Sequence, residues 1–313
     1  MDGMTDGEGA LVSREGDGAG TRAGFVALIG APNAGKSTLL NRLVGTKVSI
    51  VTHKVQTTRS LVRGIAVHGR SQIVFVDTPG IFTPKRALDR AMVRSAWSGA
   101  RDADLVVFMV DAERGLAGEA VDILRDLESL KLPKVLVLNK VDRIKRDTLL
   151  LLTAEANAKV AFDRTFMVSA LNGSGVADLM DYLAGQMPAS PFYYPEDQVS
   201  DFPLRQLASE ITREKLFLRL HQELPYATHI ETESWEEGKK GLRIEQVIYV
   251  QRESQRSIVL GKGGATIKAI GKAAREELTG LLERPVHLFL FVKVRDWEKD
   301  PERYREMGLE FPQ

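Results

Sequence analysis

The sequence predicts two domains of different fold class, an α/β domain at residues 24–188 and an α+β domain at residues 204–313. Three observations support this division. In the first part, short apolar runs alternate with longer amphipathic segments, which is typical of a mostly parallel sheet with helices on both faces. Residues 189–203 are rich in proline, which favours a semi-rigid linker. After the linker the order of helical and β-rich segments changes, so we expect a second, smaller domain there.

The strands of the first domain are expected to be covered on both faces, because several of them are continuously apolar. The predicted strands are Phe25–Ile29, Ser60–Val67, Ser71–Val76, Leu105–Val110, Lys134–Leu138 and Arg164–Val168. The predicted helices are Thr38–Val44, Arg86–Gly99, Gly118–Leu130, Thr148–Ala161 and Gly175–Gln186. In such a fold, ligands bind at the carboxyl ends of the strands.

The second domain is expected to begin with a helix and two β-rich runs. These segments are Leu204–Leu220, Thr228–Ser234 and Arg243–Gln251. A short apolar strand, a helix and a last strand are predicted to follow, at Ser257–Gly261, about Thr266–Leu282 and Val286–Val294. A glycine cluster separates the short strand from the helix.

Composition limits the class of protein. The chain has 43% hydrophobic and 27% charged residues, as in soluble globular proteins, and a formal net charge of +1, so any basic surface must be local. It has no cysteines, which excludes structural disulfides and thiolate metal sites and fits a reducing, cytoplasmic compartment. No apolar run approaches the roughly 18 residues of a membrane span. Residues 1–23 lack the apolar segment of a signal peptide and are predicted to form a disordered tail.

A glycine-bounded loop lies between the first predicted strand and the first helix. Its residues are Gly30, Ala31, Pro32, Asn33, Ala34, Gly35, Lys36 and Ser37, and Thr38 follows. This arrangement is typical of a P-loop, in which backbone N–H groups and a helix N-terminus face a phosphate chain. We expect Lys36 to bridge the β- and γ-phosphates and to act in catalysis, and the Ser37 hydroxyl to bind Mg²⁺.

Three later motifs, each at the end of a predicted strand, indicate which nucleotide is bound. Their residues are Asp77, Thr78, Pro79, Gly80 and Ile81, then Asn139, Lys140 and Asp142, and finally Ser169 and Ala170. The first motif places a carboxylate near Mg²⁺ and the Gly80 N–H near the γ-phosphate. In the second, the Asp142 carboxylate accepts from guanine N1–H and the N2 amino group, a donor pair that adenine lacks. Asn139 is expected at the other edge of the base, and the Lys140 stem over its plane.

The Ala170 N–H is expected to meet guanine O6. Because adenine would leave these buried polar groups unpaired, the motifs predict guanine specificity. The set resembles the translation-factor-related GTPases.

Residues 51–59 occupy the place of a mobile loop whose threonine joins Mg²⁺ only when a γ-phosphate is present. We favour Thr58 over Thr57 for this role, with an ordinary polar surface loop as the alternative. Ras-like enzymes have a water-orienting Gln where this chain has Ile81, so we predict slow intrinsic hydrolysis that rises when a partner orders the loop. In several GTPases with similar loops, the Asn that matches Asn33 helps to hold K⁺, which is a hypothesis here. The alternative is a turn residue that tolerates unusual torsions.

The second domain carries a Gly-x-x-Gly loop before a helix. The loop residues are Gly261, Lys262, Gly263 and Gly264, and the helix carries Lys268, Lys272 and Arg275. This is the loop of a KH domain, which holds single-stranded RNA, and the element order suggests the prokaryotic type II topology. Between Lys239 and Asp296 there are 12 Lys and Arg against 6 Asp and Glu. This local excess indicates a phosphate-binding surface.

The whole set of motifs, followed by a KH module, resembles the Era family, the bacterial GTPases of small ribosomal subunit assembly, across about residues 24–310. The resemblance implies a KH domain that grips the 3′ end of 16S rRNA when GTP is bound, and a role in 30S subunit assembly. It also implies a cytoplasmic protein, partly peripheral on the inner membrane, and we expect a monomer. The chain departs from the family at Phe82–Lys85, where His-Lys-Pro-Lys is common.

Two other functions remain open from the sequence. In the first, a membrane-signalling GTPase would use its basic C-terminal module to bind anionic lipid. The second, a metabolic kinase, would leave the motif Asn139–Asp142 without a purpose.

Overall fold

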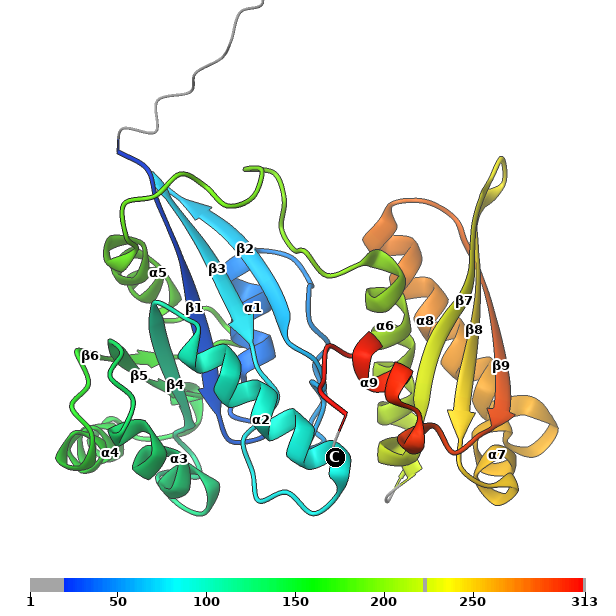
Figure 1. The fold of residues 1–313 in the computed structure, drawn as a ribbon, viewed down its shortest axis with the longest axis horizontal. Coiled ribbons are helices and arrows are strands. Elements are labelled where there is room, and N and C mark those ends of the chain that lie inside the picture. Colours follow the sequence, from blue (N-terminus) through cyan, green and yellow to red (C-terminus); the bar gives the residue numbers. More distant parts are fainter. Residues whose placement is uncertain (1–19, 222–223, 312–313) are drawn as a thin grey trace, which may run out of the picture.

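Two domains pack against each other in the structure, a computed structural model that describes residues 20–221 and 224–311 (Figure 1). The larger domain contains a sheet with strand order β2-β3-β1-β4-β5-β6, in which β2 pairs antiparallel with β3 and the other pairs are parallel. Its strands are β1 (Arg22–Gly30), β2 (Val62–His68), β3 (Ser71–Asp77), β4 (Leu105–Asp111), β5 (Lys134–Asn139) and β6 (Arg164–Val168). Its helices are α1 (Lys36–Val44), α2 (Ala87–Arg101), α3 (Glu119–Glu128), the short 3-10 helix η1 (Val141–Arg143), α4 (Arg146–Lys159) and α5 (Val176–Gln186).

Helices cover both faces of this sheet, as predicted. Leu40 of α1 and Leu183 of α5 lie in the core on one face. Ala96 of α2, Ile123 of α3 and Leu152 of α4 lie in the core on the other. Every residue of β3 and β4 is buried. Strands enclosed in this way need apolar side chains on both faces, which explains their continuously apolar sequences.

The smaller domain has a three-stranded sheet with order β7-β8-β9, in which β7 and β8 are antiparallel and β8 and β9 are parallel. Its elements are α6 (Leu204–Arg219), η2 (Leu224–Ala227), β7 (His229–Gly238), β8 (Gly241–Val250), α7 (Glu253–Leu260), η3 (Lys262–Gly264), α8 (Ala265–Leu282), β9 (Val286–Val294), η4 (Trp297–Lys299) and α9 (Pro301–Glu306). Side chains of α6 and α8 pack on one face of the sheet with Leu242 and Ile244. This topology confirms the predicted type II KH order.

The prediction of a strand at Ser257–Gly261 is wrong, because this segment is the end of α7. The Gln255 side-chain oxygen accepts the N–H groups of Gln251 and Arg252 at 2.8 and 3.1 Å, which caps the first turn of the helix. Within the apolar run Val259 is fully buried, whereas Ile258 is exposed. The run therefore supplies one core side chain to a surface helix.

The predicted tail 1–23 ends too late, because β1 already begins at Arg22. The N–H groups of Arg22 and Ala23 donate to the carbonyl oxygens of Arg70 and Pro188, so both residues belong to the folded domain. The rest of the predicted tail, residues 1–19, lies outside the described residues. The predicted linker 189–203 also follows the larger domain closely, with a bridge between Ser200 and Gly64 beside β2.

The C-terminal segment packs between the two domains, which the sequence did not predict. We call its buried residues Trp297 and Tyr304 the wedge. Trp297 and Tyr304 are buried together with Leu88 and Met92 of α2 and with Tyr249 of β8. Figure 1 shows α9 between the two domains, close to α2. None of the helices in the described part of the chain is both long and apolar enough to cross a bilayer.

Candidate nucleotide site and RNA interface

The P-loop leaves the end of β1 and opens α1, as its sequence predicts. Lys36 is buried, and its ammonium donates to the carbonyl oxygens of Gly30 and Ala31 at 3.1 and 3.2 Å. Burial lowers the pKa of Lys36 to about 8, and the Asp77 carboxylate opposes part of this change. Gly35 has a φ of 99°, and an added Cβ would lie 2.2 Å from the Asn139 amide nitrogen. The loop therefore requires glycine at this position.

Four oxygen-bearing side chains converge beside the P-loop, and among them the Ser49 hydroxyl donates to Asp77 Oδ2 at 2.9 Å. The Ser37 hydroxyl donates to Asp77 Oδ2 at 2.6 Å and lies 3.0 Å from the Thr58 hydroxyl, which is 3.4 Å from the same carboxylate oxygen. Burial raises the pKa of Asp77, although Lys36 and the surrounding hydroxyl groups oppose the rise. Among the described residues, Asp77 Oδ1 has no hydrogen-bond partner. A buried, unpaired carboxylate oxygen beside the hydroxyls of Ser37 and Thr58, with Ser49 holding the same carboxylate, is a donor set that fits Mg²⁺.

The two candidate threonines of the loop 51–59, Thr57 and Thr58, differ in their contacts. Thr57 faces its own loop, with its hydroxyl 2.7 Å from the Thr52 hydroxyl and donating to the carbonyl oxygen of Lys54 at 2.8 Å. Thr58 faces Ser37 and Asp77. This geometry supports the choice of Thr58 over Thr57.

The base-recognition motifs meet at the ends of β5 and β6, but two residues have contacts that differ from the predicted ones. The Asn139 amide donates to the carbonyl oxygen of Ala34 at 2.8 Å, and its oxygen accepts the Ala170 N–H at 3.0 Å. Asn139 thus joins three loops, and the N–H that was expected to meet guanine O6 is engaged within the protein. A hydrogen bond from Ser169 lowers the pKa of the exposed Asp142 carboxyl, so Asp142 is an ionised acceptor near neutral pH.

Lys140, at φ 66°, places its ammonium 2.5 Å from Asp111 Oδ2. This ion pair orients the side chain whose stem was predicted to cover the base.

Ile81 and Gly80 hold the loop after β3 against the P-loop. The Ile81 N–H donates to the Gly30 carbonyl oxygen at 3.1 Å, and its side chain is buried in the core. An added Cβ on Gly80 would lie 2.9 Å from Pro32 Cα, so the two backbones approach closely there. The apolar, buried Ile81 has no group that orients a water molecule.

The structure gives Asn33 the conformation of a turn residue, one of the two roles that the sequence left open. It has a φ of 64°, so it is a turn residue in the left-handed region. Its amide also donates to the carbonyl oxygen of His53 at 3.0 Å, which ties the P-loop to the loop 51–59.

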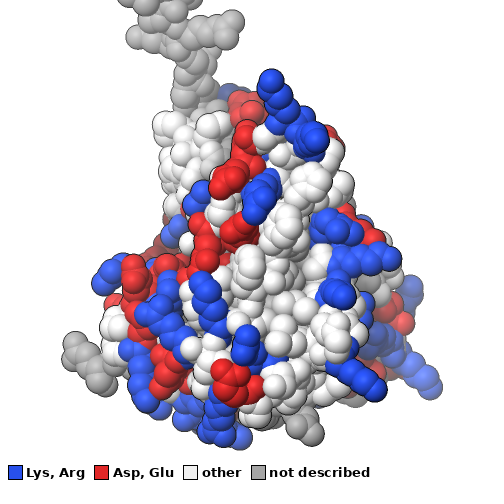
Figure 2. Space-filling model, turned by 90° about the vertical axis from the view of Figure 1, so that its right-hand side faces the viewer, with Lys and Arg blue, Asp and Glu red and all other residues white. Residues whose placement is uncertain are grey.

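The Gly-x-x-Gly loop connects α7 to α8, so a helix precedes it. Gly263 has a φ of 59°, and no described atom lies within 4 Å of an added Cβ there. Lys268, Lys272 and Arg275 are exposed on α8. Figure 2 shows the outer end of this domain, with Lys and Arg side chains at its right-hand edge and an uncharged surface beside them. The glycine loop and these cations together form an open surface suited to a phosphate backbone.

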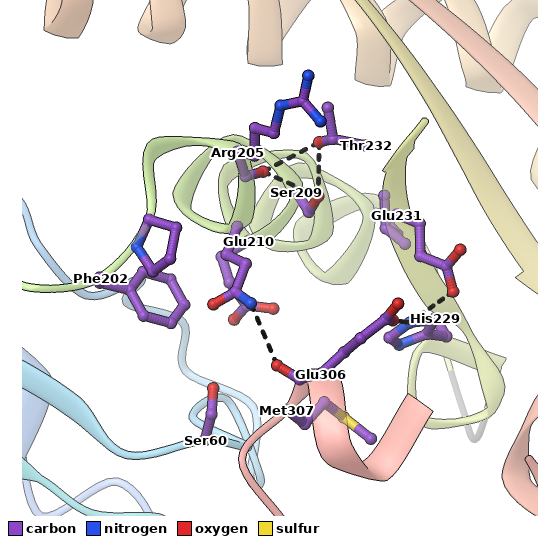
Figure 3. A pocket seen from close by; sticks show the side chains of 13 residues that line it. Ser60, Phe202, Arg205, Ser209, Glu210, His229, Glu231, Thr232, Glu306 and Met307 are labelled. Carbon is purple, nitrogen blue, oxygen red and sulfur yellow. Dashed lines mark hydrogen bonds and ion pairs between the residues drawn. The ribbon is translucent and has the colours of Figure 1, made fainter. Parts of the chain in front are cut away.

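A cavity of about 310 Å³ between the domains contains a cluster that the sequence did not predict (Figure 3). His229, Glu231 and Glu306 have ligand atoms within 4.8 Å of one another. The Arg303 guanidinium lies between the carboxylates, 2.5 Å from Glu231 and 3.1 Å from Glu306. Because Arg303 already pairs with both carboxylates, we interpret the cluster as an ion-pair network. Its members are separated by up to 77 positions, so their spacing gave no signal.

Comparison with known proteins identifies the family. The GTPase Era of Agrobacterium fabrum is 67% identical over 314 residues, which cover 100% of this chain and 99% of the relative. The chain belongs to the Era family of GTPases. The GTPase Era of Rhizobium meliloti is 69% identical over 294 residues, with 93% of this chain and 94% of the relative covered. The family described as 50S ribosome-binding GTPase matches residues 25–140, and the KH domain family matches residues 223–298.

Solved structures of Era confirm the fold of both domains. Era of Aquifex aeolicus bound to GDP·AlF4⁻ is 38% identical, with a TM-score of 0.87, 92% of this chain covered and 99% of that chain. Era in complex with MgGDPNP and nucleotides 1506–1542 of 16S ribosomal RNA has the same identity and coverage, with a TM-score of 0.88. This Era-family chain is therefore a P-loop GTPase with a type II KH domain.

Proposed function

We propose that this Era-family GTPase is a slow switch that binds the 3′ end of 16S rRNA through its KH domain and acts in 30S subunit assembly. The proposal rests on the observation that one chain contains both a nucleotide site and an RNA-binding surface. The convergence of Ser37, Thr58 and Asp77 supports a site that responds to the γ-phosphate. The loop Gly261–Gly264 beside exposed Lys and Arg side chains supports an RNA-binding site. The relative that binds 16S rRNA supports this choice of RNA.

In the proposed cycle, the phosphates of GTP lie along the P-loop N–H groups, with Lys36 at the β- and γ-phosphates. Ser37, Asp77 and Thr58 would hold Mg²⁺, which supplies charge neutralisation on the phosphate oxygens. Asp142 selects guanine. Because Ile81 cannot orient water, hydrolysis is slow until the loop 51–59 is ordered. The protein acts as a switch because its affinity for RNA differs between the GTP-bound and GDP-bound states.

Three further proposals concern a K⁺ site, the oligomeric state and location of the protein, and its association with the membrane. The Asn33 amide nitrogen donates to the His53 carbonyl, so its Oδ1 is the side-chain atom that we propose for a K⁺ site beside the phosphates, and equal hydrolysis rates in K⁺ and Na⁺ would exclude it. We propose that the protein is cytoplasmic and that it is a monomer. Sedimentation of the purified protein measures its oligomeric state. We also propose that it associates peripherally with the inner membrane, which flotation with vesicles checks.

The test of RNA binding compares the GTP-loaded protein with two glycine variants. Cross-linked RNA is sequenced for the wild type, for Gly263→Asp and for Gly280→Asp. Both positions leave open space for the new side chain, and both changes add one negative charge. We expect 16S rRNA 3′ sequences with the wild type and Gly280→Asp, and their loss with Gly263→Asp while GTP binding is retained. Equal capture by both variants would overturn the RNA site. Vesicle binding without RNA capture would favour the lipid-binding alternative.

A further inference from the structure

The loop from Thr46 to Arg59, which we call the bridging loop, contacts the nucleotide site on one side and the KH domain on the other. Toward the nucleotide site, Thr58 meets Ser37 and Asp77. Toward the KH domain, the side chain of Ile50 is buried against α6 and α8. The bridging loop therefore has two independent sets of partners, and its conformation depends on both.

Arg213 of α6 contacts the residue that immediately precedes Thr58. Its guanidinium donates through Nη2 to the carbonyl oxygen of Thr57. The Thr57 carbonyl and the Thr58 N–H belong to one planar peptide unit. A contact that fixes the direction of this carbonyl therefore also fixes the orientation of the Thr58 N–H. The carbonyl that Arg213 contacts and the Thr58 hydroxyl that faces Ser37 therefore belong to adjacent residues.

The Arg213 side chain is held rigidly. It is 2% exposed, its Nε donates to Glu210 Oε1 at 2.8 Å, and the guanidinium lies 5.1 Å from the centre of the Phe217 ring. Burial of a guanidinium is costly unless its N–H groups find acceptors, and among the described residues its Nη1 has none. Nη2 also donates to Glu210 Oε2, so loss of the Thr57 carbonyl would leave one of the two N–H groups of Nη2 without an acceptor, and α6 favours the ordered bridging loop.

Glu214, the next residue of α6, secures the start of the same loop. Its carboxylate accepts the Val51 N–H at 2.8 Å and pairs with Lys47 at 2.8 Å. Lys47 also pairs with Glu277 of α8, the helix that carries the exposed cations. Helix α6 thus contacts both ends of the bridging loop, and α8, which carries the exposed cations, contacts its start.

We propose that Arg213 is a positioning residue of the GTPase site, which orients Thr58 toward the γ-phosphate side from within the KH domain. This inference rests on the proposed role of Thr58 and adds the residue that sets its position. The KH domain then contributes in cis to discrimination between GTP and GDP. Arg213 acts through the Thr57 peptide and does not itself touch nucleotide.

The test measures nucleotide affinity without RNA and without turnover. Fluorescent GDPNP and GDP are titrated, over a range of Mg²⁺ concentrations, into the wild type, Arg213→Met, Arg213→Lys and Arg219→Met. Arg219 is exposed in the last turn of α6, so its change is the matched control. With Arg213→Met we expect GDPNP affinity to fall about tenfold or more while GDP affinity stays within about twofold. Arg213→Lys should recover part of the loss, because an ammonium can still donate to the carbonyl.

Hydrogen exchange of the GDPNP-bound protein gives a second readout. Amides of residues 51–59 should exchange faster in Arg213→Met than in the wild type or Arg219→Met. Equal loss of GDP and GDPNP affinity, or wild-type affinity for both, would overturn the proposal.

If Arg213→Met does not fold, Glu210→Gln serves instead, because it removes the ionic partner of Arg213 and should shift GDPNP affinity in the same direction by a smaller factor. An unchanged ratio of GDPNP to GDP affinity in Glu210→Gln would then overturn the proposal. The readouts involve no RNA, so a protein that binds no 16S rRNA would refute the proposed function and leave this inference to be decided separately.

Discussion

The side-chain amide of Asn139 donates to the carbonyl oxygen of Ala34 at 2.8 Å, so the base-recognition motif is joined directly to the P-loop. The same side chain accepts the Ala170 N–H at 3.0 Å. One buried amide therefore joins the three loops of the proposed nucleotide site. Its role is to keep the phosphate and base sites in register, which differs from the direct base contact that the sequence suggested.

Asn139→Ala is expected to weaken GTP and GDP binding alike, by about tenfold or more, because both nucleotides use the joined loops. It should also lower the free energy of unfolding by about 1–3 kcal/mol, since the Ala34 carbonyl and the Ala170 N–H lose their buried partner. Nucleotide titration and urea unfolding measure the two effects. Asn157→Ala, which removes an exposed amide on α4, is the control and should change neither. A selective loss of GTP binding alone would contradict the structural role.

Asp142→Asn is expected to change which base is bound. In the proposed site the carboxylate accepts two guanine donors, whereas an amide at this position offers a donor that suits the O2 carbonyl of xanthine. GTP affinity should fall by about a hundredfold or more and XTP affinity should rise. Competition titrations with both nucleotides check this exchange. Retained preference for GTP over XTP would show that Asp142 does not read the base.

The nucleotide site could be predicted from the sequence because each of its motifs follows a buried strand. Lys36, Asp77 and Asp142 stand where apolar runs end, and the carboxyl ends of parallel strands share one edge of the sheet. Local sequence thus predicts the fold class and the edge of the sheet at which these three residues lie. The contact of Asn139 with Ala34 could not be read, because it depends on how two loops 105 positions apart approach each other.

The contacts between the domains could not be predicted for the same reason. Arg213 and Thr57 are 156 positions apart, and nothing in α6 distinguishes a buried arginine from an exposed one before the domains dock. The wedge of Trp297 and Tyr304 was also missed, although it carried a local signal. Asp300 caps α9 by accepting the Glu302 N–H at 3.1 Å, and Pro301 occupies the first turn. This Asp-Pro pair is a recognised helix start.

Lys36 predicts a pH dependence of nucleotide binding. Burial lowers its pKa from 10.5 to about 8 in the folded protein. Between about pH 8 and 10.5 the unfolded chain holds a proton that the folded chain lacks, so the contribution of this group to stability rises with pH in that window. Phosphate binding acts in the opposite direction, because its negative charge favours the ammonium form. Above pH 8, GTP binding should therefore take up a proton, and affinity should fall by up to about tenfold per pH unit.

Calorimetry in buffers of different ionisation enthalpy measures this proton uptake. In Lys36→Arg the guanidinium stays charged, so uptake and pH slope should both disappear, whatever the overall affinity. Equal uptake at pH 7 and pH 9 would show that Lys36 is fully protonated in the free protein.

Arg59 predicts how the end of the bridging loop supports domain packing. Its guanidinium donates to the carbonyl oxygens of Thr228 and Tyr226 at 2.8 and 3.0 Å, and lies 5.4 Å from the Trp297 ring. Arg59→Met keeps most of the apolar stem but leaves two buried carbonyl groups without these donors. The free energy of unfolding should fall by about 1–3 kcal/mol, and the amides of 224–228 should exchange faster with solvent.

Arg101→Met, at an exposed position on α2, provides the matched control and should leave both quantities unchanged. The prediction separates packing from nucleotide sensing, because Arg59 holds the KH domain side of the loop and Thr58 the phosphate side. GDP affinity should therefore remain near that of the wild type in Arg59→Met, since the P-loop and Asp142 are untouched. If stability and exchange match the control while GDP affinity falls, then Arg59 serves the nucleotide site and the domain contact depends on the wedge of Trp297 and Tyr304.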